Sequence, residues 1–250
     1  MLRLLAFVAL LATGACHGVG TRGGAEACKP IEFEGSHFTI CAAKPGKHRL
    51  LLAAAGADGQ PLRDFDRLEG ALGPDKERVA FAMNAGMFDK ESRPIGLYVE
   101  NGREIRPLNR RAGPGNFHMK PNGVFYVDHA GWHVADTDAF ADSRHDGLRF
   151  ATQSGPMLVI NGELHPGFAD NGTSLQTRNG VGVSLDGTAW FVISDEPVSF
   201  GRFARLFRDK LTCPDALYFD GFVSRLWDPP GRRRDAGVAI GPIVVALQSR

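Results

Sequence analysis

The stretch ATQSGPMLVING, residues 151–162, places a Ser-Gly-Pro triplet (154–156) directly before an apolar run. The run at 157–160 predicts a buried strand, and the Asn-Gly pair after it predicts a tight hairpin turn. Glycine lets a backbone or a ligand approach closely, and proline fixes the direction of the chain. We therefore expect this stretch to form one wall of a site.

The composition is that of a globular domain built from many short strands. The chain has 250 residues, of which 43% are hydrophobic and 23% charged, so it can bury a sizeable core. Its 31 glycines and 15 prolines favour short strands joined by turns over long helices. We predict an α+β fold: a single domain over residues 28–250 with a mixed, mostly β core and a few packing helices.

The N-terminal segment has the pattern of a secretory signal peptide over residues 1–15. Arg3 precedes an apolar run at 4–11, and small residues follow. Cys16 comes next, so lipidation of its thiol and plain secretion are both open. Residues 16–27 are glycine-rich and predict a flexible leader or lipid tether. We expect an exported protein, either periplasmic or anchored to the membrane through Cys16.

The charge balance argues against a nucleic-acid partner. Loss of Arg3 with the leader lowers the count of Lys and Arg from 29 to 28, which equals the 28 Asp and Glu. A neutral chain offers no strong basic field for a phosphate backbone. The basic run at 232–234 is expected to be a solvated loop.

The cysteines predict one disulfide. Cys28 and Cys41 flank the segment IEFEGSHFTI, which resembles two short strands around a turn, and an exported protein would pair them. Cys213 is left over and is expected to be buried. The chain has no CxxC pair and no His-rich tract that would indicate a zinc site.

The acidic segment DTDAFADSRHD does not have the register of an EF-hand loop, because Phe140 and Ala141 stand where a ligand and a glycine are needed. We expect an acidic helix start there. The four acidic residues are Asp136, Asp138, Asp142 and Asp146. No cofactor is expected, and a divalent cation stays open as an alternative.

Several apolar strands end in polar residues. Strands are predicted at 79–82, 189–194 and 216–219. They are followed by Asn84, by Asp195-Glu196 and by Asp220-Gly221, respectively. Asn and Asp also cap ordinary turns, and this alternative applies to both Asn84 and Asp220. Helices are expected at 62–80 and 199–211, with packing roles. If the strand ends converge, they form a cleft that contains two or three carboxylates.

Four motifs, taken in order, resemble the phosphodiester glycosidase (uncovering-enzyme-like) family over roughly residues 78–248. These are MNAGMF at 83–88, SGP with NG at 154–162, RNGVG at 178–182 and ALYFDGFVS at 216–224. The stretches at 96–117 and 154–166 look typical of a bacterial exported branch of uncharacterised members. Phe222-Val223 replaces a Gly-Gly of the family, and Tyr218 replaces an Asn, so the substrate of its best-known enzyme is not carried over.

The resemblance implies hydrolysis of a sugar-1-phosphodiester in a cell-envelope or environmental glycan. A phosphate monoester leaves as a stable anion, so the larger need is a carboxylate near C1 that stabilises oxocarbenium character or activates water. Asp220 is the first candidate for that carboxylate, and Asp195 and Glu196 are the second. The expected substrate-binding residues are Asn84, Lys120, Ser154, Gly155, Arg178, Asn179, Gly221 and Ser224.

Within that set, Arg178 would hold the phosphate through a bidentate contact, helped by Lys120, Asn84 and Ser154. Ser154 is not expected to be a nucleophile, because no Gly-x-Ser-x-Gly elbow surrounds it. Two rival functions stay open. One is a non-catalytic envelope module that binds phosphorylated glycan. The other is a metal-dependent phosphoesterase, and the lack of a dense His/Asp motif in the sequence argues against it.

Overall fold

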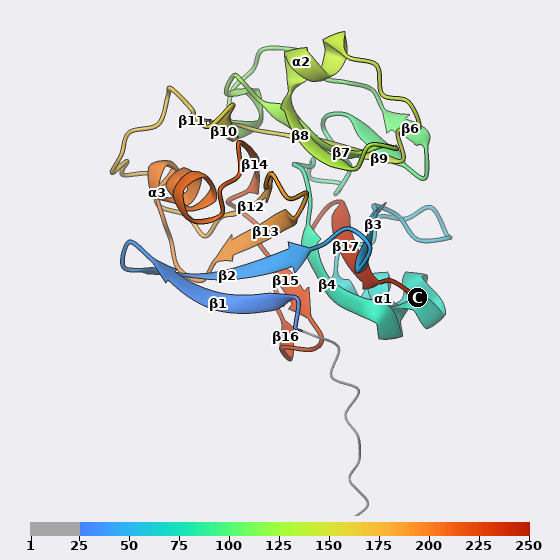
Figure 1. Ribbon diagram of the computed structural model, residues 1–250. Coiled ribbons are helices and arrows are strands. Elements are labelled where there is room, and N and C mark those ends of the chain that lie inside the picture. Colours follow the sequence, from blue (N-terminus) through green and yellow to red (C-terminus); the bar gives the residue numbers. More distant parts are fainter. Residues whose placement is uncertain (1–25) are drawn as a thin grey trace, which may run out of the picture.

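The structure is a computed structural model that describes residues 26–250, so the predicted signal peptide and Cys16 lie outside the described residues. The strands of this described part of the chain form three antiparallel sheets (Figure 1). The largest has seven strands. In spatial order they are β1 (Cys28–Phe33), β2 (Ser36–Ala43), β13 (Ala189–Ser194), β12 (Asn179–Val183), β14 (Asp215–Asp220), β10 (Met157–Ile160) and β11 (Glu163–Leu164).

The two other sheets have five strands each. The first, called the β4 sheet, has the order β16 (Arg233–Arg234), β15 (Leu226–Asp228), β4 (Val79–Asn84), β17 (Ile243–Gln248) and β3 (His48–Ala53). The second, called the β9 sheet, has the order β6 (Arg103–Arg106), β5 (Tyr98–Glu100), β9 (Phe150–Ser154), β7 (Gly123–Val127) and β8 (Trp132–Asp136). These elements confirm the predicted α+β class with a mostly β core.

The stretch at 151–162 connects two of the sheets. Ser154 ends β9 in the β9 sheet, and the predicted strand Met157–Ile160 is β10 of the seven-stranded sheet. The Asn-Gly pair that follows has φ angles of 50° and 84°, as a type I′ hairpin turn requires, and joins β10 to β11. The chain therefore changes sheets at Ser-Gly-Pro, and this brings the end of β9 beside β14.

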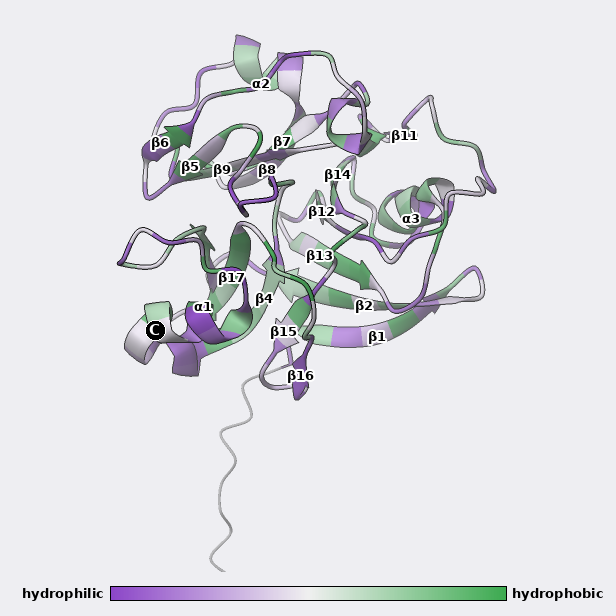
Figure 2. Cartoon of the chain, turned by 180° about the vertical axis from the view of Figure 1, so that it is seen from behind, coloured by the Kyte–Doolittle hydropathy of each residue, from purple (hydrophilic) through white to green (hydrophobic). Residues whose placement is uncertain are grey.

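The three sheets pack on a shared aromatic centre. Phe191 of β13 lies 5.3 Å from Phe81 of β4 and 5.6 Å from Phe125 of β7, measured between ring centroids, and Phe219 of β14 lies 6.5 Å from Phe191. Each aromatic pair adds about 0.5–1.5 kcal/mol beyond the burial of its area. The hydropathy of the residues agrees with this packing: in Figure 2, hydrophobic residues lie along β4, β17 and β13, and hydrophilic residues lie along the outer loops.

The helices are few and short, and the first differs from its prediction. Residues 62–80 were expected to form one helix, but α1 covers only Phe65–Leu72 and a 3₁₀ helix follows at Gly73–Arg78. Gly73 adopts φ 53° and Pro74 follows it, a combination that ends an α-helix. The other helices are α2 (Thr137–Asp142), α3 (Phe200–Arg205), the π-helix Leu206–Lys210 that continues α3, and a 3₁₀ helix at Asn116–His118.

Two local predictions are confirmed. Cys28 and Cys41 form a disulfide across the β1–β2 pair, and Cys213 is a buried free thiol. The acidic segment starts a helix, because the Asp136 side chain accepts hydrogen bonds from the backbone N–H groups of Asp138 and Ala139 at the N-terminus of α2.

The basic run at 232–234 differs from its prediction as a solvated loop. Two of its arginines form strand β16 and pair with carboxylates: Arg233 contacts Asp195 at 2.7 Å, and Arg234 contacts Glu69 at 2.9 Å.

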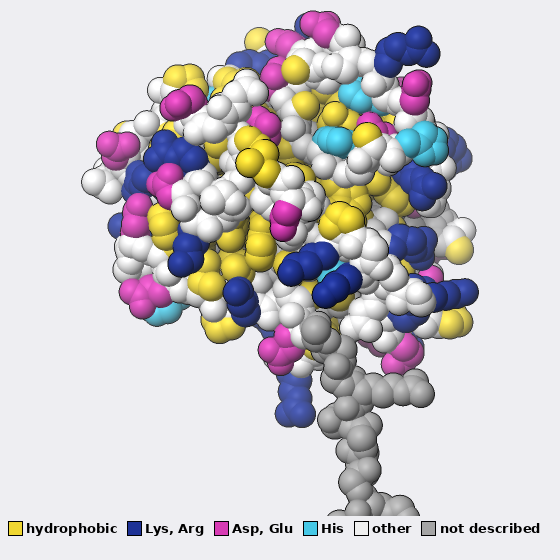
Figure 3. Space-filling view, viewed as in Figure 1, with side chains coloured by type: hydrophobic (Ala, Val, Ile, Leu, Met, Phe, Trp, Pro, Cys, Tyr) yellow, Lys and Arg dark blue, Asp and Glu magenta, His cyan; other side chains and the backbone are white. Residues whose placement is uncertain are grey.

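Across the face drawn in Figure 3, Lys and Arg side chains lie scattered among acidic and apolar ones. Among the described helices, none is long and apolar enough to cross a membrane.

Candidate functional site

The ends of β4 and β14 meet at the start of β12. Asn179 Nδ2 donates to the backbone oxygen of Asn84 at 2.8 Å and lies 3.2 Å from its side-chain oxygen. Asn179 Oδ1 accepts from the backbone N–H of Asp220 at 3.0 Å. All three residues are 9% exposed or less. Two of the strand ends that the sequence marked as polar, those at Asn84 and Asp220, therefore converge around one buried amide.

The Asp220 carboxyl group is held by one oxygen. Its Oδ1 accepts from the backbone N–H groups of Gly221, Phe222 and Val223 at 2.6, 2.7 and 3.2 Å. Its Oδ2 has no hydrogen-bond partner within residues 26–250. Burial raises the pKa of Asp220, and the three N–H groups oppose that rise by stabilising the carboxylate. The result is an oriented carboxyl group with one oxygen left for chemistry.

The loop after Asp220 is fixed from two sides. Asn84 Nδ2 donates to the Val223 oxygen at 2.7 Å, and Asn84 Oδ1 accepts from the backbone N–H of Arg225 at 2.8 Å. The Ser224 hydroxyl lies 3.2 Å from the backbone oxygen of Asp220 and 3.3 Å from Asn179 Oδ1. Asn84 and Ser224 therefore act on the position of the loop rather than only capping a turn.

Arg178 is completely enclosed, and its donors contact protein atoms. Nε donates to the Val198 oxygen at 2.8 Å, Nη2 to the Ser174 oxygen at 2.7 Å, and Nη1 to the Tyr218 hydroxyl at 3.2 Å. Its guanidinium also lies over the Phe200 ring at 3.6 Å, a cation–π contact. This arrangement fixes Tyr218 beside the Asp220 turn and leaves Arg178 without an open face toward a ligand.

Of three other expected binding residues, Ser154 and Gly155 lie in the wall behind the site, whereas Lys120 lies beside a separate hollow. The Ser154 hydroxyl donates to the Phe219 oxygen at 2.9 Å and ties β9 to β14. Gly155 packs so closely on Asn122 that a Cβ atom there would lie 2.6 Å from the Asn122 Cβ. Lys120 donates to Asn122 Oδ1 at 2.9 Å and lines a separate hollow beside α2.

The adjacent carboxylates after β13 point to different partners. Asp195 accepts from Arg233 at 2.7 Å and from the Thr39 hydroxyl, and it shares the charge of Arg233 with Asp235. Glu196 is bound to His37 at the edge of the seven-stranded sheet, through the backbone N–H at 3.2 Å and the imidazole ring at 3.5 Å. Asp195 lines the cleft described next, whereas Glu196 does not.

An open cleft of about 430 Å³ lies over the Asp220 loop and is called the Asp220-loop cleft. Phe222 and Val238 are 90% and 60% exposed and supply apolar surface to it. Its polar lining comes from the segment before β12, the end of β13, the loop after Asp220 and the β16 region. These residues are Thr177, Ser194, Asp195, Ser224, Arg225, Arg233 and Asp235. The cleft thus combines exposed apolar side chains with charged groups.

Sequence reasoning missed Arg225 and Arg233 as cleft residues. Arg225 follows Ser224 within two residues of the Phe-Val substitution, which was the available signal, while Arg233 was hidden in the basic run. Tyr218 was noted only as a departure from the family pattern, and the structure adds its contact with Arg178. Among residues 26–250, no group of three or more His, Cys, Asp or Glu is arranged to hold a metal ion.

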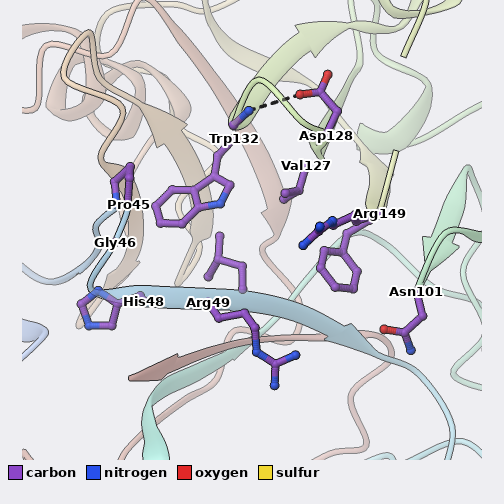
Figure 4. Close-up of a pocket in the computed structure, with 12 residues that line it drawn as sticks. Pro45, Gly46, His48, Arg49, Asn101, Val127, Asp128, Trp132 and Arg149 are labelled. Atoms are coloured by element: carbon purple, nitrogen blue, oxygen red, sulfur yellow. Dashed lines mark hydrogen bonds between the residues drawn. The ribbon is translucent and has the colours of Figure 1, made fainter. Parts of the chain in front are cut away.

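A second hollow, of about 540 Å³, lies elsewhere in the molecule. Figure 4 shows Trp132 and Arg149 beside it, together with His48 and Arg49 of β3. Phe150 lines it at the start of β9, whereas Ser154 ends that strand beside β14. The second hollow is therefore at the opposite end of β9 from the Asp220 loop, and none of the four sequence motifs lines it.

The sequence profile of the phosphodiester glycosidase family matches residues 77–235, more than half of the chain. This protein therefore belongs to the phosphodiester glycosidase family. The Escherichia coli K12 protein YigE, an uncharacterised protein, is 41% identical over 150 residues, which make up 60% of this chain and 58% of YigE. The chain thus spans less than two thirds of that curated relative. Both findings confirm the resemblance inferred from the motifs.

Two solved structures have a similar fold. The catalytic domain of zebrafish N-acetylglucosamine-1-phosphodiester alpha-N-acetylglucosaminidase, auto-inhibited by its pro-peptide, matches with a TM-score of 0.57 at 14% identity, over 89% of this chain and 82% of that one. A putative exported protein of Burkholderia pseudomallei matches with a TM-score of 0.53 at 12% identity, over 85% and 74%. At these identities the likeness establishes the fold.

Proposed function

We propose that this protein hydrolyses the C1–O bond of a sugar-1-phosphodiester. The observation that carries the proposal is the Asp220 carboxyl group, which has one oxygen fixed by three N–H groups and one oxygen without a partner among the described residues. It stands in a motif of the phosphodiester glycosidase family, where the ends of β4, β12 and β14 meet. A carboxylate in this position suits a centre where positive charge develops.

In this reaction the bond between C1 and the phosphate oxygen breaks, and the oxygen of a water molecule bonds to C1. The phosphate monoester departs as an anion and needs little protonation. Asp220 either stabilises the oxocarbenium-like C1 while the departing phosphate takes the proton of the attacking water, or accepts that proton itself. Arg178 serves as a positioning residue, because its contacts hold Tyr218 and the start of the loop.

The environment of the substrate follows from the N-terminal sequence. We propose that the protein is exported and acts on cell-envelope or environmental glycan, with Cys16 as an acylation site when the leader is processed at that residue. The exposed Phe222 and Val238 at the Asp220-loop cleft support an apolar contact with the sugar ring or with the group beyond the phosphate.

The test is a panel of sugar-1-phosphodiesters and of ordinary phosphodiesters, assayed with and without a chelator. The proposal predicts release of free sugar and a phosphate monoester from at least one sugar-1-phosphodiester, unaffected by the chelator. Cleavage of the P–O bond that a chelator abolishes would instead support a metal-dependent phosphoesterase. Binding without turnover across the whole panel would support a non-catalytic envelope module.

A further inference from the structure

Arg225 carries a buried guanidinium that has no hydrogen-bond partner among residues 26–250. Its side chain is 5% exposed, Nη2 is fully enclosed without a hydrogen bond, and within residues 26–250 no carboxylate lies within 4 Å of the group. The Asp235 and Asp64 charges act on it only from a distance. An unsatisfied buried cation costs several kcal/mol relative to a solvated one, so such a residue calls for an explanation.

The two neighbouring arginines lack this feature. Arg178 donates to two backbone oxygens and to Tyr218. Arg233 donates to both oxygens of Asp235, at 3.0 and 3.1 Å, and to Asp195 at 2.7 Å. Of the three arginines around the Asp220 loop, Arg225 alone keeps its donors unused.

The position of Arg225 connects it to the candidate carboxylate. Its backbone N–H donates to Asn84 Oδ1, and the preceding Ser224 hydroxyl donates to the backbone oxygen of Asp220, the residue that carries this carboxylate. Arg225 lines the Asp220-loop cleft together with Ser224 and Phe222. A ligand that occupies the cleft therefore lies beside Arg225 and next to the loop that holds Asp220.

We propose that Arg225 binds the phosphate of the substrate diester through its guanidinium group, an assignment that rests on the proposed function. Nε and Nη1 donate to no residue within 26–250 and, unlike Nη2, are not fully enclosed, so they can donate charge-assisted hydrogen bonds to a phosphate oxygen. Neither acidic residue that lines the cleft is hydrogen-bonded to Arg225. Asp195 is paired with Arg233 and Thr39, and Asp235 is paired with Arg233 and the Leu226 N–H.

The same charges predict a preference among phosphates. Arg225 and Arg233 together offset the charges of Asp195 and Asp235, so the lining of the cleft is close to neutral. A phosphodiester adds one negative charge to this lining, whereas a phosphomonoester adds close to two at neutral pH and is repelled more strongly by Asp195 and Asp235. The cleft therefore favours the diester substrate over the monoester product, which helps the product leave.

The experiment measures binding of dimethyl phosphate, a diester without a sugar, by ³¹P NMR titration of the full chain. Arg225→Gln is expected to weaken this binding at least tenfold, and the matched control Arg234→Gln, which removes an arginine paired with Asp66 and Glu69 outside the cleft, to leave it unchanged. Monomethyl phosphate is expected to bind the wild-type protein more weakly than dimethyl phosphate. Equal binding by the wild-type and Arg225→Gln proteins would overturn the proposal.

A second measurement uses the wild-type protein, in case Arg225→Gln does not fold. NMR spectra of the arginine side-chain N–H groups follow Arg225 and Arg234 separately. Dimethyl phosphate is expected to shift the Arg225 resonances and not those of Arg234, whereas unshifted Arg225 resonances at concentrations that saturate the ³¹P titration would contradict the assignment. Arg225-dependent binding without hydrolysis of any panel substrate would refute only the proposed reaction. Hydrolysis with an unchanged KM in Arg225→Gln would refute only the phosphate contact.

Discussion

The side-chain nitrogen of Asn179 lies 2.8 Å from the backbone oxygen of Asn84 and joins the seven-stranded sheet to the β4 sheet. The other end of the same amide accepts from the Asp220 N–H and from the Ser224 hydroxyl. One buried amide therefore positions the end of β4, the end of β14 and the loop that lines the Asp220-loop cleft. The arrangement of the candidate site therefore depends on this amide.

Replacement of Asn179 by alanine is expected to damage both stability and activity. The change leaves buried polar groups of Asn84 and Asp220 without partners, which should lower the free energy of unfolding by about 2–4 kcal/mol. Displacement of Asp220 should lower kcat by about 100-fold. Urea unfolding and turnover of a substrate from the panel measure the two effects. Asn171→Ala, at an exposed loop position, is the control and should match the wild-type protein.

Gly221 allows Tyr218 and the Asp220 loop to pack together. A Cβ atom at position 221 would overlap the Tyr218 hydroxyl and lie 3.4 Å from Arg178 Nη1. We expect Gly221→Ala to destabilise the fold by about 1–3 kcal/mol through this overlap. Tyr218→Phe removes the overlapping oxygen, so the double variant should lose less stability than the two single variants together. Strictly additive losses in urea unfolding would show that the overlap is not the cause.

The raised pKa of Asp220 predicts a definite pH dependence. Because burial stabilises the protonated form in the folded state, the folded pKa lies above the ordinary value of 3.8. The activity, which needs the carboxylate, should fall as the pH drops through that folded pKa. Stability runs the opposite way: the contribution of Asp220 is most favourable below the unfolded pKa and is lost as the pH rises to the folded pKa.

The kcat/KM profile and the stability difference between wild-type and Asp220→Asn proteins measure these effects. The acidic limb of the profile should lie above pH 3.8, and the wild-type protein should lose stability relative to Asp220→Asn as the pH rises through that region. An acidic limb at or below the ordinary value would mean that the three backbone N–H contacts outweigh burial.

Much of the fold could be predicted from the sequence, because its signals are local. The strand Met157–Ile160 and its Asn-Gly turn, the strand Ala189–Ser194 and the Cys28–Cys41 pair follow from apolar runs, turn chemistry and spacing. The helix at 62–80 was predicted too long because the apolar spacing continues past Gly73, where the backbone leaves the helical region.

The site was harder to predict, because its contacts join distant parts of the chain. The polar strand ends marked Asn84 and Asp220, and these do converge. Arg178 and Arg225 look equally available in the sequence, and only the packing of Phe200, Val198 and Ser174 distinguishes an enclosed guanidinium from an unpartnered one. Residue type alone cannot show which donors the protein itself has used.

The most direct measurement is turnover of a sugar-1-phosphodiester by Asp220→Asn and Asp215→Asn proteins. The two carboxyl groups lie at opposite ends of β14, both have pKa values raised by burial, and Asp215 accepts a hydrogen bond from the Asn161 N–H in a turn. The account predicts that Asp220→Asn folds but loses at least about 100-fold in kcat, while Asp215→Asn stays close to the wild-type rate. Near-normal turnover by a folded Asp220→Asn protein would contradict it.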